Sequence, residues 1–207
     1  MEKFQKINSS AVPLPMENTD TDQIIPARFL KATTREGFGE NLFADWRLAS
    51  DGSPNENFVL NSKIYRGSIL IAGRNFGCGS SREHAAWALY DYGFRAVVSS
   101  FFADIFKGNA LNNGLLPITI TTAELDQVFL AIEKNPLVQF EIDLETQLFT
   151  CLDIDLKIKF EINSYKRHCL LNGLDDTDFL VSQKVKIEAF EKRTNRMEQD
   201  CAAMQES

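Results

Sequence analysis

The stretch GSILIAGRNFGCGSSREHAAWALYDYGFRAVVSSFFADIFKGNALNNGLLPITI, residues 67–120, has the clearest pattern of secondary structure in this chain. Three short apolar segments alternate in it with two longer segments in which apolar residues recur at helical spacing. We expect strands at residues 68–73, 95–100 and 115–120, and helices after Ser81 and over residues 101–114. This β-α-β-α-β order predicts a parallel sheet at the core of an α/β fold.

Segments on both sides of this stretch extend the predicted core. Residues 122–135 show a helical apolar stripe, and residues 137–162 alternate apolar and polar side chains as antiparallel strands do. We expect two or three strands there, followed by a short helix that Gly173 ends. Residues 3–7 are expected to form a first strand before a turn region rich in Pro and Asp. The predicted fold class is therefore α/β, with a mainly parallel core and an additional antiparallel hairpin region.

The length and composition are those of an ordinary globular protein. A chain of 207 residues, 44% of them hydrophobic, can bury one substantial core, so we expect a single domain over residues 1–207. Its polar end, at about 191–207, is expected to be a fraying helix or disordered. No apolar run approaches the roughly 20 residues of a membrane helix, and the N-terminus does not resemble a secretory signal, so we expect a cytoplasmic protein. The net charge of −7 argues against a nucleic-acid partner.

The cysteines do not form a pattern that binds metal. Cys78, Cys151, Cys169 and Cys201 are widely spaced, without a CxxC pair or a histidine at zinc-finger distance. We therefore expect reduced thiols, no disulfide framework, and no metal cluster held by this chain alone.

The segment between the first strand and the first helix of the core has the composition of a ligand-binding loop. Gly77 and Gly79 flank Cys78, and glycines allow positive φ angles and a close approach of the backbone to a ligand. Ser80 or Ser81 is placed to cap the helix that follows. Because a helix N-terminus favours anions, the loop is predicted to form an anion site.

Two arginines point to a carboxylate ligand, but the residues alone leave alternatives open. Arg74 and Arg82 lie on this loop, and guanidinium groups pair bidentately with carboxylates. The loop lacks the lysine of a Walker motif, the third glycine of the dinucleotide fingerprint and the GxSxG of a nucleophile elbow. A nucleophilic Cys78 near His84 stays open, and so does a tight turn without function.

Two aspartates precede the predicted core on the N-terminal side. Asp20 and Asp22, in DTDQII, either order the loop of the site or cap their own backbone, as aspartates in turns commonly do. The residues do not decide between these roles, although backbone capping is the commoner one.

Three segments of the chain resemble one known family. They are NTDTDQIIPARFLKATTREGFGENLFADWR (18–47), GRNFGCGSSREHAAWALYDYGFRAVVSSFFADIFKGNALNNGLLPI (73–118) and RHCLLNGLDD (167–176). Together they closely resemble the small subunits of bacterial 3-isopropylmalate dehydratases, or isopropylmalate isomerases, in the aconitase superfamily. GCGSSREHA is typical of that superfamily, and TDQIIPARFL of its separate small subunits.

This resemblance implies a fold, a partner and roles for individual residues. The fold would be a swivelling β/β/α domain that closes over a 4Fe-4S cluster on a separate large subunit, with no metal on this chain. By the same match, Ser80 is the catalytic base, Ser81 and Arg82 contact substrate carboxylates, and Arg35 is a second substrate-binding arginine. The anion site around the reactive serine would be formed by Gly77, Cys78 and Gly79.

The implied function is that of a hydro-lyase subunit in leucine biosynthesis, active only with its large subunit. The enzyme would convert 2-isopropylmalate to 3-isopropylmalate through 2-isopropylmaleate. Other malate-type substrates, such as homoaconitate, citraconate or 2,3-dimethylmalate, stay open because Ser80 and Arg82 contact only the shared core, and residues 30–36 are expected to decide among them. A non-catalytic carboxylate-binding module is the alternative from another class. Lyase activity with the large subunit separates these two classes.

Overall fold

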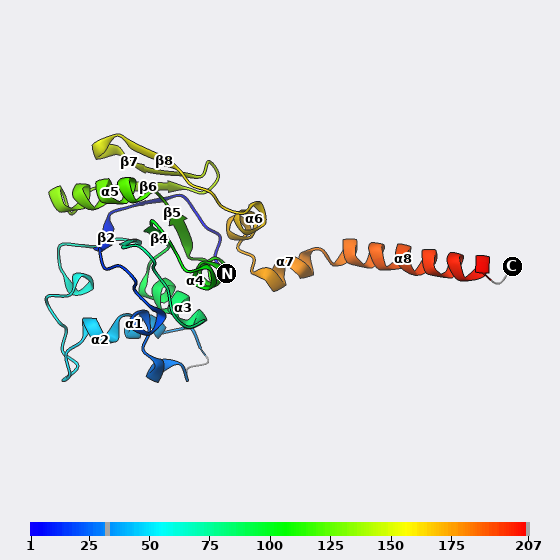
Figure 1. The fold of residues 1–207 in the computed structure, drawn as a ribbon, viewed down its shortest axis with the longest axis horizontal. Helices are drawn as coiled ribbons and strands as arrows, with labels where there is room; N and C mark the ends of the chain where they lie inside the picture. Colours follow the sequence, from blue (N-terminus) through cyan, green and yellow to red (C-terminus); the bar gives the residue numbers. More distant parts are fainter. Residues whose placement is uncertain (32–33, 206–207) are drawn as a thin grey trace.

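The computed structural model of this chain contains the three strands and two helices expected in residues 67–120 (Figure 1). The structure describes the backbone of residues 1–31 and 34–205, and the side chains of residues 1–31 and 34–194. The elements alternate as β3 (Ile69–Ala72), α3 (Glu83–Tyr92), β4 (Ala96–Ser99), α4 (Asp104–Asn112) and β5 (Leu116–Thr119). The three strands are parallel neighbours, so the predicted parallel α/β core is confirmed.

A fourth strand, which the sequence analysis did not predict, completes the parallel sheet. β2 (Ala11–Leu14) pairs with β3 and gives the strand order β2-β3-β4-β5. Its Pro13 has no N–H to donate and makes the segment look like a turn, but an edge strand tolerates proline. The strand at the other edge, β5, also contains a proline, Pro117. The strand expected at residues 3–7 lies slightly later, as β1 (Ile7–Ser9), and belongs to the second sheet.

Both faces of the parallel sheet are covered. Ile71 and Val98 point to a core shared with α5 (Thr122–Lys134) and the second sheet. Leu70 and Val97 point to the opposite core, which α3 and α4 cover. Because β3 and β4 are buried at every position, their sequences are continuous apolar runs rather than alternating ones.

The second sheet is antiparallel and has the strand order β1-β6-β7-β8. Its later strands are β6 (Phe140–Asp143), β7 (Leu148–Cys151) and β8 (Leu156–Lys159), with the 3-10 turn η4 (Leu152–Ile154) between the last two. Phe140, Ile142 and Phe149 face the core, and their neighbours in sequence are more exposed. The antiparallel region expected at residues 137–162 is therefore confirmed, with three strands and β1 added at one edge.

Short helical turns make up most of the segment between β2 and β3. They are α1 (Thr21–Ile24), η1 (Ala27–Phe29), η2 (Phe38–Asn41), α2 (Ala44–Arg47) and η3 (Val59–Asn61). The segment docks on α3 at Gly39, whose N–H donates to Asp91 Oδ2 at 2.7 Å. A Cβ on Gly39 would lie only 2.4 Å from the backbone nitrogen of Tyr92, so the contact requires glycine. The weakly periodic segment is thus packed against the last turn of α3.

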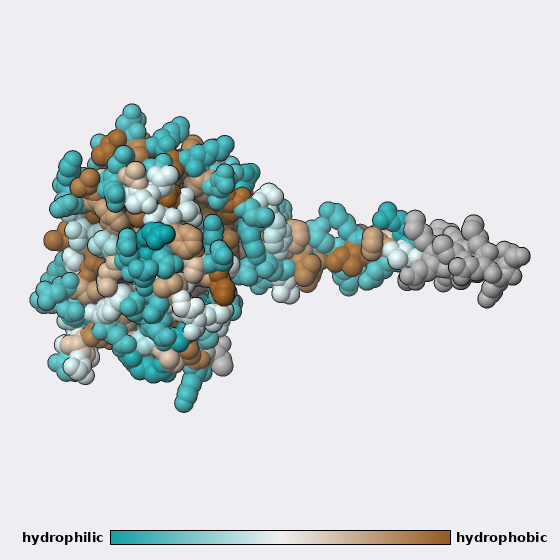
Figure 2. Space-filling view, in the orientation of Figure 1, coloured by the Kyte–Doolittle hydropathy of each residue, from teal (hydrophilic) through white to brown (hydrophobic). Residues whose placement is uncertain are grey.

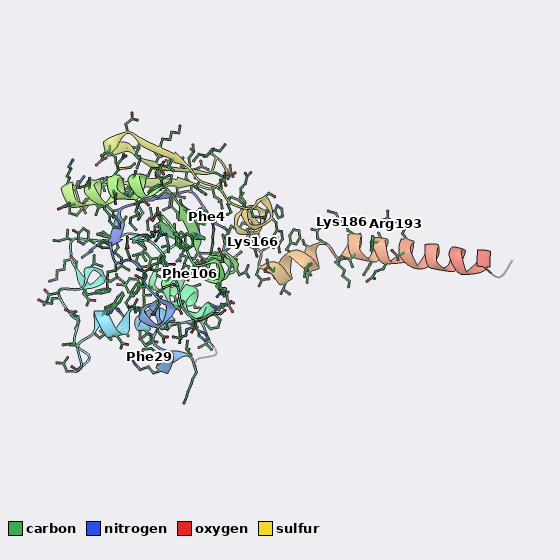
Figure 3. All side chains as sticks on the ribbon, in the orientation of Figure 1. Phe4, Phe29, Phe106, Lys166, Lys186 and Arg193 are labelled. Carbon is green, nitrogen blue, oxygen red and sulfur yellow. The ribbon has the colours of Figure 1, made fainter. Side chains whose placement is uncertain are left out.

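Three helices follow the second sheet: α6 (Ser164–Asn172), α7 (Asp176–Ser182) and α8 (Lys184–Gln205). Gly173 ends α6 with a φ of 70°, as expected. Figure 1 shows α8 extending away from the body, and Figure 3 shows Lys186 and Arg193 on it, far from Phe106. The division into one domain with a tail from about residue 191 stays a prediction. Within the described residues, no helix is both long and apolar enough to span a bilayer.

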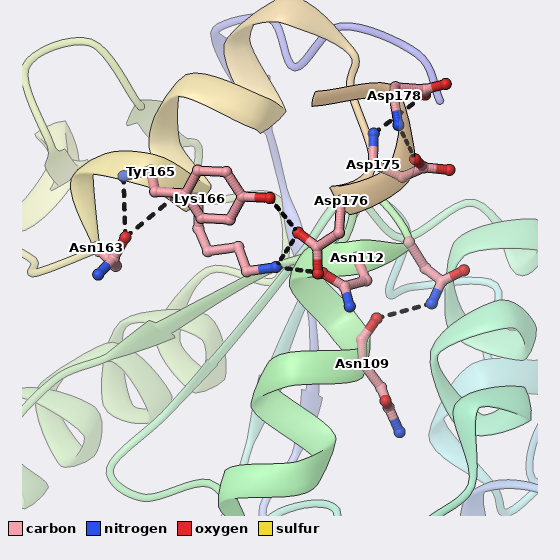
Figure 4. Close-up of polar contacts among 9 residues, drawn as sticks. Asn109, Asn112, Asn163, Tyr165, Lys166, Asp175, Asp176 and Asp178 are labelled. Atoms are coloured by element: carbon pink, nitrogen blue, oxygen red, sulfur yellow. Dashed lines mark hydrogen bonds and ion pairs between the residues drawn. The ribbon is translucent and has the colours of Figure 1, made fainter. Parts of the chain in front are cut away.

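Four paired polar side chains join α4, α6 and α7 (Figure 4), and we call them the corner cluster. Lys166 Nζ donates to Asn112 Oδ1 and to Asp176 Oδ1, each at 2.5 Å. The Tyr165 hydroxyl donates to the same Asp176 oxygen at 2.7 Å. The hydrogen bond from Lys166, supported by the one from Tyr165, lowers the pKa of Asp176, and the bond to this carboxylate raises the pKa of Tyr165. The cluster therefore fixes the start of α7 on the body.

Candidate functional site

Three loops meet at the carboxyl ends of β2, β3 and β4. Backbone hydrogen bonds join them: Gly77 N–H donates to Thr19 O at 2.7 Å, and Thr21 N–H donates to Cys78 O at 2.9 Å. On the other side, Phe76 N–H donates to Phe101 O at 3.1 Å. Parallel strands place the loops that follow them at one edge of the sheet, which is where α/β proteins commonly bind ligands. We call these residues, 15–20, 73–82 and 100–103, the three-loop edge.

The two glycines of the central loop are required by its geometry. Gly77 has a φ of +76°, and a Cβ there would lie 2.2 Å from Cγ of Phe106, which is buried. Gly79 has a φ of +89°, and its Cβ would lie 3.3 Å from Cβ of Asp20. Side chains are strained in this backbone region, so substitutions at either position would move the loop. The positive φ angles expected at Gly77 and Gly79 are therefore confirmed.

The two serines after these glycines are exposed and do not cap the helix. The N-cap residue of α3 is Arg82, in extended conformation, and no side chain caps this helix. The prediction that Ser80 or Ser81 is the cap was therefore wrong, because the helix begins one or two residues later than the composition suggested. Within residues 1–31 and 34–194, neither serine hydroxyl has a hydrogen-bond partner, although Ser80 O accepts a bond from Thr21 Oγ1 at 2.8 Å.

Arg82 is held by a side chain of α1, and Arg74 is not. The Arg82 side chain is only 14% exposed and pairs through Nη1 with Asp22 Oδ1. Arg74 is exposed, and its guanidinium lies 5.9 Å from the centroid of the Phe101 ring. The two arginines near the serines in sequence therefore have different surroundings. Arg82 pairs with the carboxylate of Asp22, whereas Arg74 lies near an aromatic ring.

Arg35 reaches the first turn of α3 from the long segment before β3. Its Nη2 lies 3.8 Å from Glu83 Oε1, and its guanidinium lies 5.1 Å from the centroid of the Trp87 ring. Glu83 Oε1 also accepts a hydrogen bond from the buried Asn113, at 2.9 Å. The structure thus brings Arg35 to the residue that follows Arg82, although Glu83 and Asn113 were not predicted to belong to the site. Residues 32–33, in the loop expected to select the substrate, lie outside the described residues.

Cys78 does not have the surroundings of a reactive thiol. Its Sγ lies 3.4 Å from Asn18 O, in hydrogen-bond contact. Burial, together with the negative charge of Asp20, raises the pKa of this thiol. The ring of His84 packs against Trp87 and Phe38, with centroid distances of 4.4 and 5.5 Å. A thiolate at Cys78 is therefore disfavoured at neutral pH, which argues against the alternative of a cysteine nucleophile.

The two aspartates of DTDQII have different roles. Asp20 is the N-cap of α1, and its carboxylate accepts from Gln23 N–H at 2.8 Å while Gln23 Oε1 accepts from Asp20 N–H at 2.9 Å. This capping box agrees with the expectation that Asp20 caps its own backbone. Asp22 instead pairs with Arg82, which agrees with the other expected role, ordering the loop of the site. Over the described part of the chain, no three His, Cys, Asp or Glu side chains are grouped as a metal site would require.

Known proteins resemble this chain over most of its length. The family model described as the aconitase C-terminal domain matches residues 1–123. A 3-isopropylmalate dehydratase small subunit from Cytophaga hutchinsonii is 60% identical over 192 residues, which cover 93% of this chain and 96% of the relative. The corresponding subunit from Sinorhizobium fredii is 50% identical over 195 residues, 94% of this chain and 96% of the relative.

The fold also resembles a solved structure. A crystal structure of a 3-isopropylmalate dehydratase from Methanocaldococcus jannaschii superimposes with a TM-score of 0.67 at 31% sequence identity. The match covers 90% of this chain and 99% of that one. The arrangement of the two sheets is therefore shared with a protein whose sequence differs at most positions.

Proposed function

Because the chain belongs to the aconitase C-terminal domain family and, within it, to the 3-isopropylmalate dehydratase small subunits, we propose that Ser80 carries the proton transfer of that reaction. The chain is a hydro-lyase subunit of leucine biosynthesis. In the proposed reaction, 2-isopropylmalate loses water to give 2-isopropylmaleate, which regains it to give 3-isopropylmalate. The observation that supports Ser80 is its exposed hydroxyl, which has no hydrogen-bond partner among the described residues and lies beside Arg82 and the uncapped start of α3.

Ser80 would remove a proton from the carbon next to a substrate carboxylate and later return it. A serine hydroxyl is a weak base, so the developing alkoxide needs a prepared anion site. The start of α3 supplies partial positive charge, and the left-handed Gly79 lets the backbone approach closely. We therefore assign Gly77, Cys78 and Gly79 to the anion site rather than to the chemistry itself.

Ser81, Arg82 and Arg35 are proposed to hold the substrate carboxylates. Arg82 is preorganised, because the ion pair with Asp22 restrains the position of its guanidinium. Arg35 is more exposed and less restrained, with a side chain 58% exposed, so it would complete the site when the substrate arrives. Two guanidinium groups match the two carboxylates of a malate-type core.

The remaining part of the active site is proposed to come from a large subunit with a 4Fe-4S cluster. The described cysteines of this chain do not fit such a cluster, because Cys78 lies in the central loop, Cys151 in β7 and Cys169 in α6. A cluster on the partner would act as a Lewis acid on the leaving hydroxyl. The family name of small subunit supports a larger partner. We also propose that the enzyme is cytoplasmic and that residues 1–207 form one domain.

Substrate choice is proposed to depend on Lys31, Thr34 and the two residues between them. An isopropyl group favours an apolar wall, and each methylene contributes about 1 to 3 kcal/mol of discrimination. A substrate with an extra carboxylate, such as homoaconitate, would instead favour an additional cation in this loop.

The test of this function is a pair of alanine variants measured with the large subunit present. We expect Ser80→Ala to lower kcat by about 10²- to 10⁴-fold with a much smaller change in KM, as removal of a general base does. Ser81→Ala is the matched control, because it removes another exposed hydroxyl one residue away and should act mainly on KM. Normal turnover by Ser80→Ala would exclude Ser80 as the base.

A further inference from the structure

Three large apolar side chains are exposed on the three-loop edge or directly beside it. Met16 follows β2 and is 43% exposed, Phe101 follows β4 and is 48% exposed, and Ile105 in the first turn of α4 is 55% exposed. The loops that carry them are joined through the central loop, since Asn18 N–H donates to Arg74 O at 2.8 Å and Phe76 N–H to Phe101 O at 3.1 Å. These three residues therefore border the loop that carries Ser80, and we call them the apolar rim.

Arg74 adds a charge to this rim. Its guanidinium lies over the Phe101 ring at 5.9 Å, and within the described residues it forms no ion pair with a carboxylate of this chain. Aromatic residues and arginines at the centre of protein interfaces contribute most of the binding energy. An exposed Phe–Arg pair beside apolar side chains thus has the chemistry of a docking surface.

Other exposed apolar side chains lie on elements away from the apolar rim. Leu130 on α5 is 53% exposed and Leu152 in η4 is 76% exposed, and both belong to the layer on the opposite side of the parallel sheet from α3 and α4. A further set on α7 and α8 comprises Leu180, Val181, Val185, Ile187 and Phe190. Figure 2 shows hydrophobic residues on this projecting arm as well as scattered over the body. None of these belongs to a loop that is hydrogen-bonded to the Ser80 loop.

We propose that the apolar rim and Arg74 are the surface on which the large subunit docks. This inference rests on the proposed function, in which Ser80 acts on a substrate held partly by that subunit. Because both serines are exposed, the partner that completes the site must cover the loops around them. The matching surface on the large subunit would be an apolar hollow for Phe101 and Ile105, with a carboxylate facing Arg74.

The experiment is a titration of purified large subunit with small-subunit variants, measured as the Kd of the complex by calorimetry or sedimentation. The double variant Phe101→Ser with Ile105→Ser is expected to raise this Kd at least about thirtyfold, as loss of an interface hot spot does. The matched control, Leu130→Ser with Leu152→Ser, removes side chains of similar or greater exposure and should leave Kd within about twofold. All four side chains are at least 48% exposed, so both double variants should keep a melting temperature close to that of the unchanged chain.

A charge reversal supplies a second measurement that does not depend on removing apolar groups. Arg74→Glu should also weaken the complex, and the loss should shrink as salt is raised, because exposed charge pairs are screened. At saturating large subunit, the double variant Phe101→Ser with Ile105→Ser should recover the normal kcat, whereas Ser80→Ala should bind normally and remain slow.

The outcomes separate the two proposals. An unchanged Kd for both rim variants would overturn the docking surface, and a weaker complex for Leu180→Ser with Phe190→Ser would place the interface on the arm instead. If the rim variants change self-association of the small subunit alone and not the Kd of the complex, the rim is a contact between two copies and the inference is wrong. Failure of Ser80→Ala to lower kcat would remove the proposed role of Ser80 whatever the Kd values are.

Discussion

The corner cluster and the Ser80 loop are both rich in polar residues, but they distribute their hydrogen bonds in opposite ways. In the corner cluster, the side chains of Lys166, Tyr165 and Asp176 bond to one another. In the Ser80 loop, the backbone makes the bonds to neighbouring loops, and the serine hydroxyls have no partner among the described residues. Side chains that satisfy each other stabilise a fold, whereas a loop fixed by its backbone leaves its side chains available for a ligand.

The strongest test of this contrast is to disturb the backbone of the loop. Gly77→Ala should destabilise the chain by about 2 to 4 kcal/mol, because the new Cβ meets Phe106 and the φ is positive. The measurement is urea unfolding followed by tryptophan fluorescence. Gly108→Ala is the control, since a Cβ on Gly108 in α4 would meet nothing within 4 Å, and it should be neutral or stabilise the helix. Equal stability of the two variants would contradict the tight fit of the loop.

The corner cluster should affect stability and leave activity intact. Asp176→Asn is expected to cost about 1 to 2 kcal/mol near neutral pH, less than a fully buried ion pair would, because solvent reaches the carboxylate. The pKa of Asp176 is lower in the folded chain than in the unfolded one, so its stabilising effect is full above its ordinary pKa and is lost as pH falls through the folded value.

The stability difference between Asp176→Asn and the unchanged chain should therefore shrink as the pH is lowered below about 4. Unfolding curves at pH 7 and at successively lower pH values measure it, with kcat at pH 7 as the second readout. A difference that stays constant with pH, or a large fall in kcat, would show that the cluster is not a purely structural ion pair.

A smaller effect, on KM, is expected for Glu83, which contacts both a structural side chain and a residue of the proposed site. This residue accepts a bond from Asn113 and also lies near Arg35, so it belongs partly to the fold and partly to the site. Glu83→Gln keeps an acceptor for Asn113 but removes the charge, and should raise KM by about two- to fivefold, the range of an exposed ion pair. Glu36→Gln is the control, because it neutralises an acid next to Arg35 in sequence that forms no ion pair among the described residues. If Arg35→Ala and Glu83→Gln add fully in the double variant, the two residues act independently.

The smallest effect should come from Cys78, which lies in the loop but is bonded like a structural residue. Cys78→Ser is expected to keep kcat within about threefold, because a thiol with a raised pKa is not the nucleophile. Steady-state kinetics with the large subunit measures it, and a loss of several orders of magnitude with the fold intact would restore the cysteine mechanism.

Local patterns predicted most of this fold. Residues 67–120 combine buried strands with amphipathic helices, and both signals depend only on neighbours in sequence. β2 was not predicted because Pro13 is typical of turns, and only the position of the strand at the sheet edge makes proline acceptable. The long segment before β3 was not resolved into α1, α2 and the 3-10 turns, because its order comes from packing on α3.

The site was predictable in its residues and less so in their surroundings. The glycines that shape the loop follow from elementary backbone sterics, and the proposed roles of Ser80, Ser81, Arg82 and Arg35 follow from the resemblance. The pairing of Arg82 with Asp22 joins residues 60 positions apart, and that of Arg35 with Glu83 depends on how a long loop folds back. The cap predicted for α3 was wrong, because composition shows which residues can cap a helix but not at which residue the helix begins.

The prolines at the two margins of the parallel sheet have a consequence for how the protein behaves at high concentration. Sheets grow into aggregates when an incoming strand hydrogen-bonds to an unpaired edge. The inner strands β3 and β4 contain no proline, whereas Pro13 lies in β2 and Pro117 in β5. Each edge thus lacks one of the N–H donors that a regular strand would have. At both edges of the sheet, a proline therefore disfavours the addition of a further strand from another molecule.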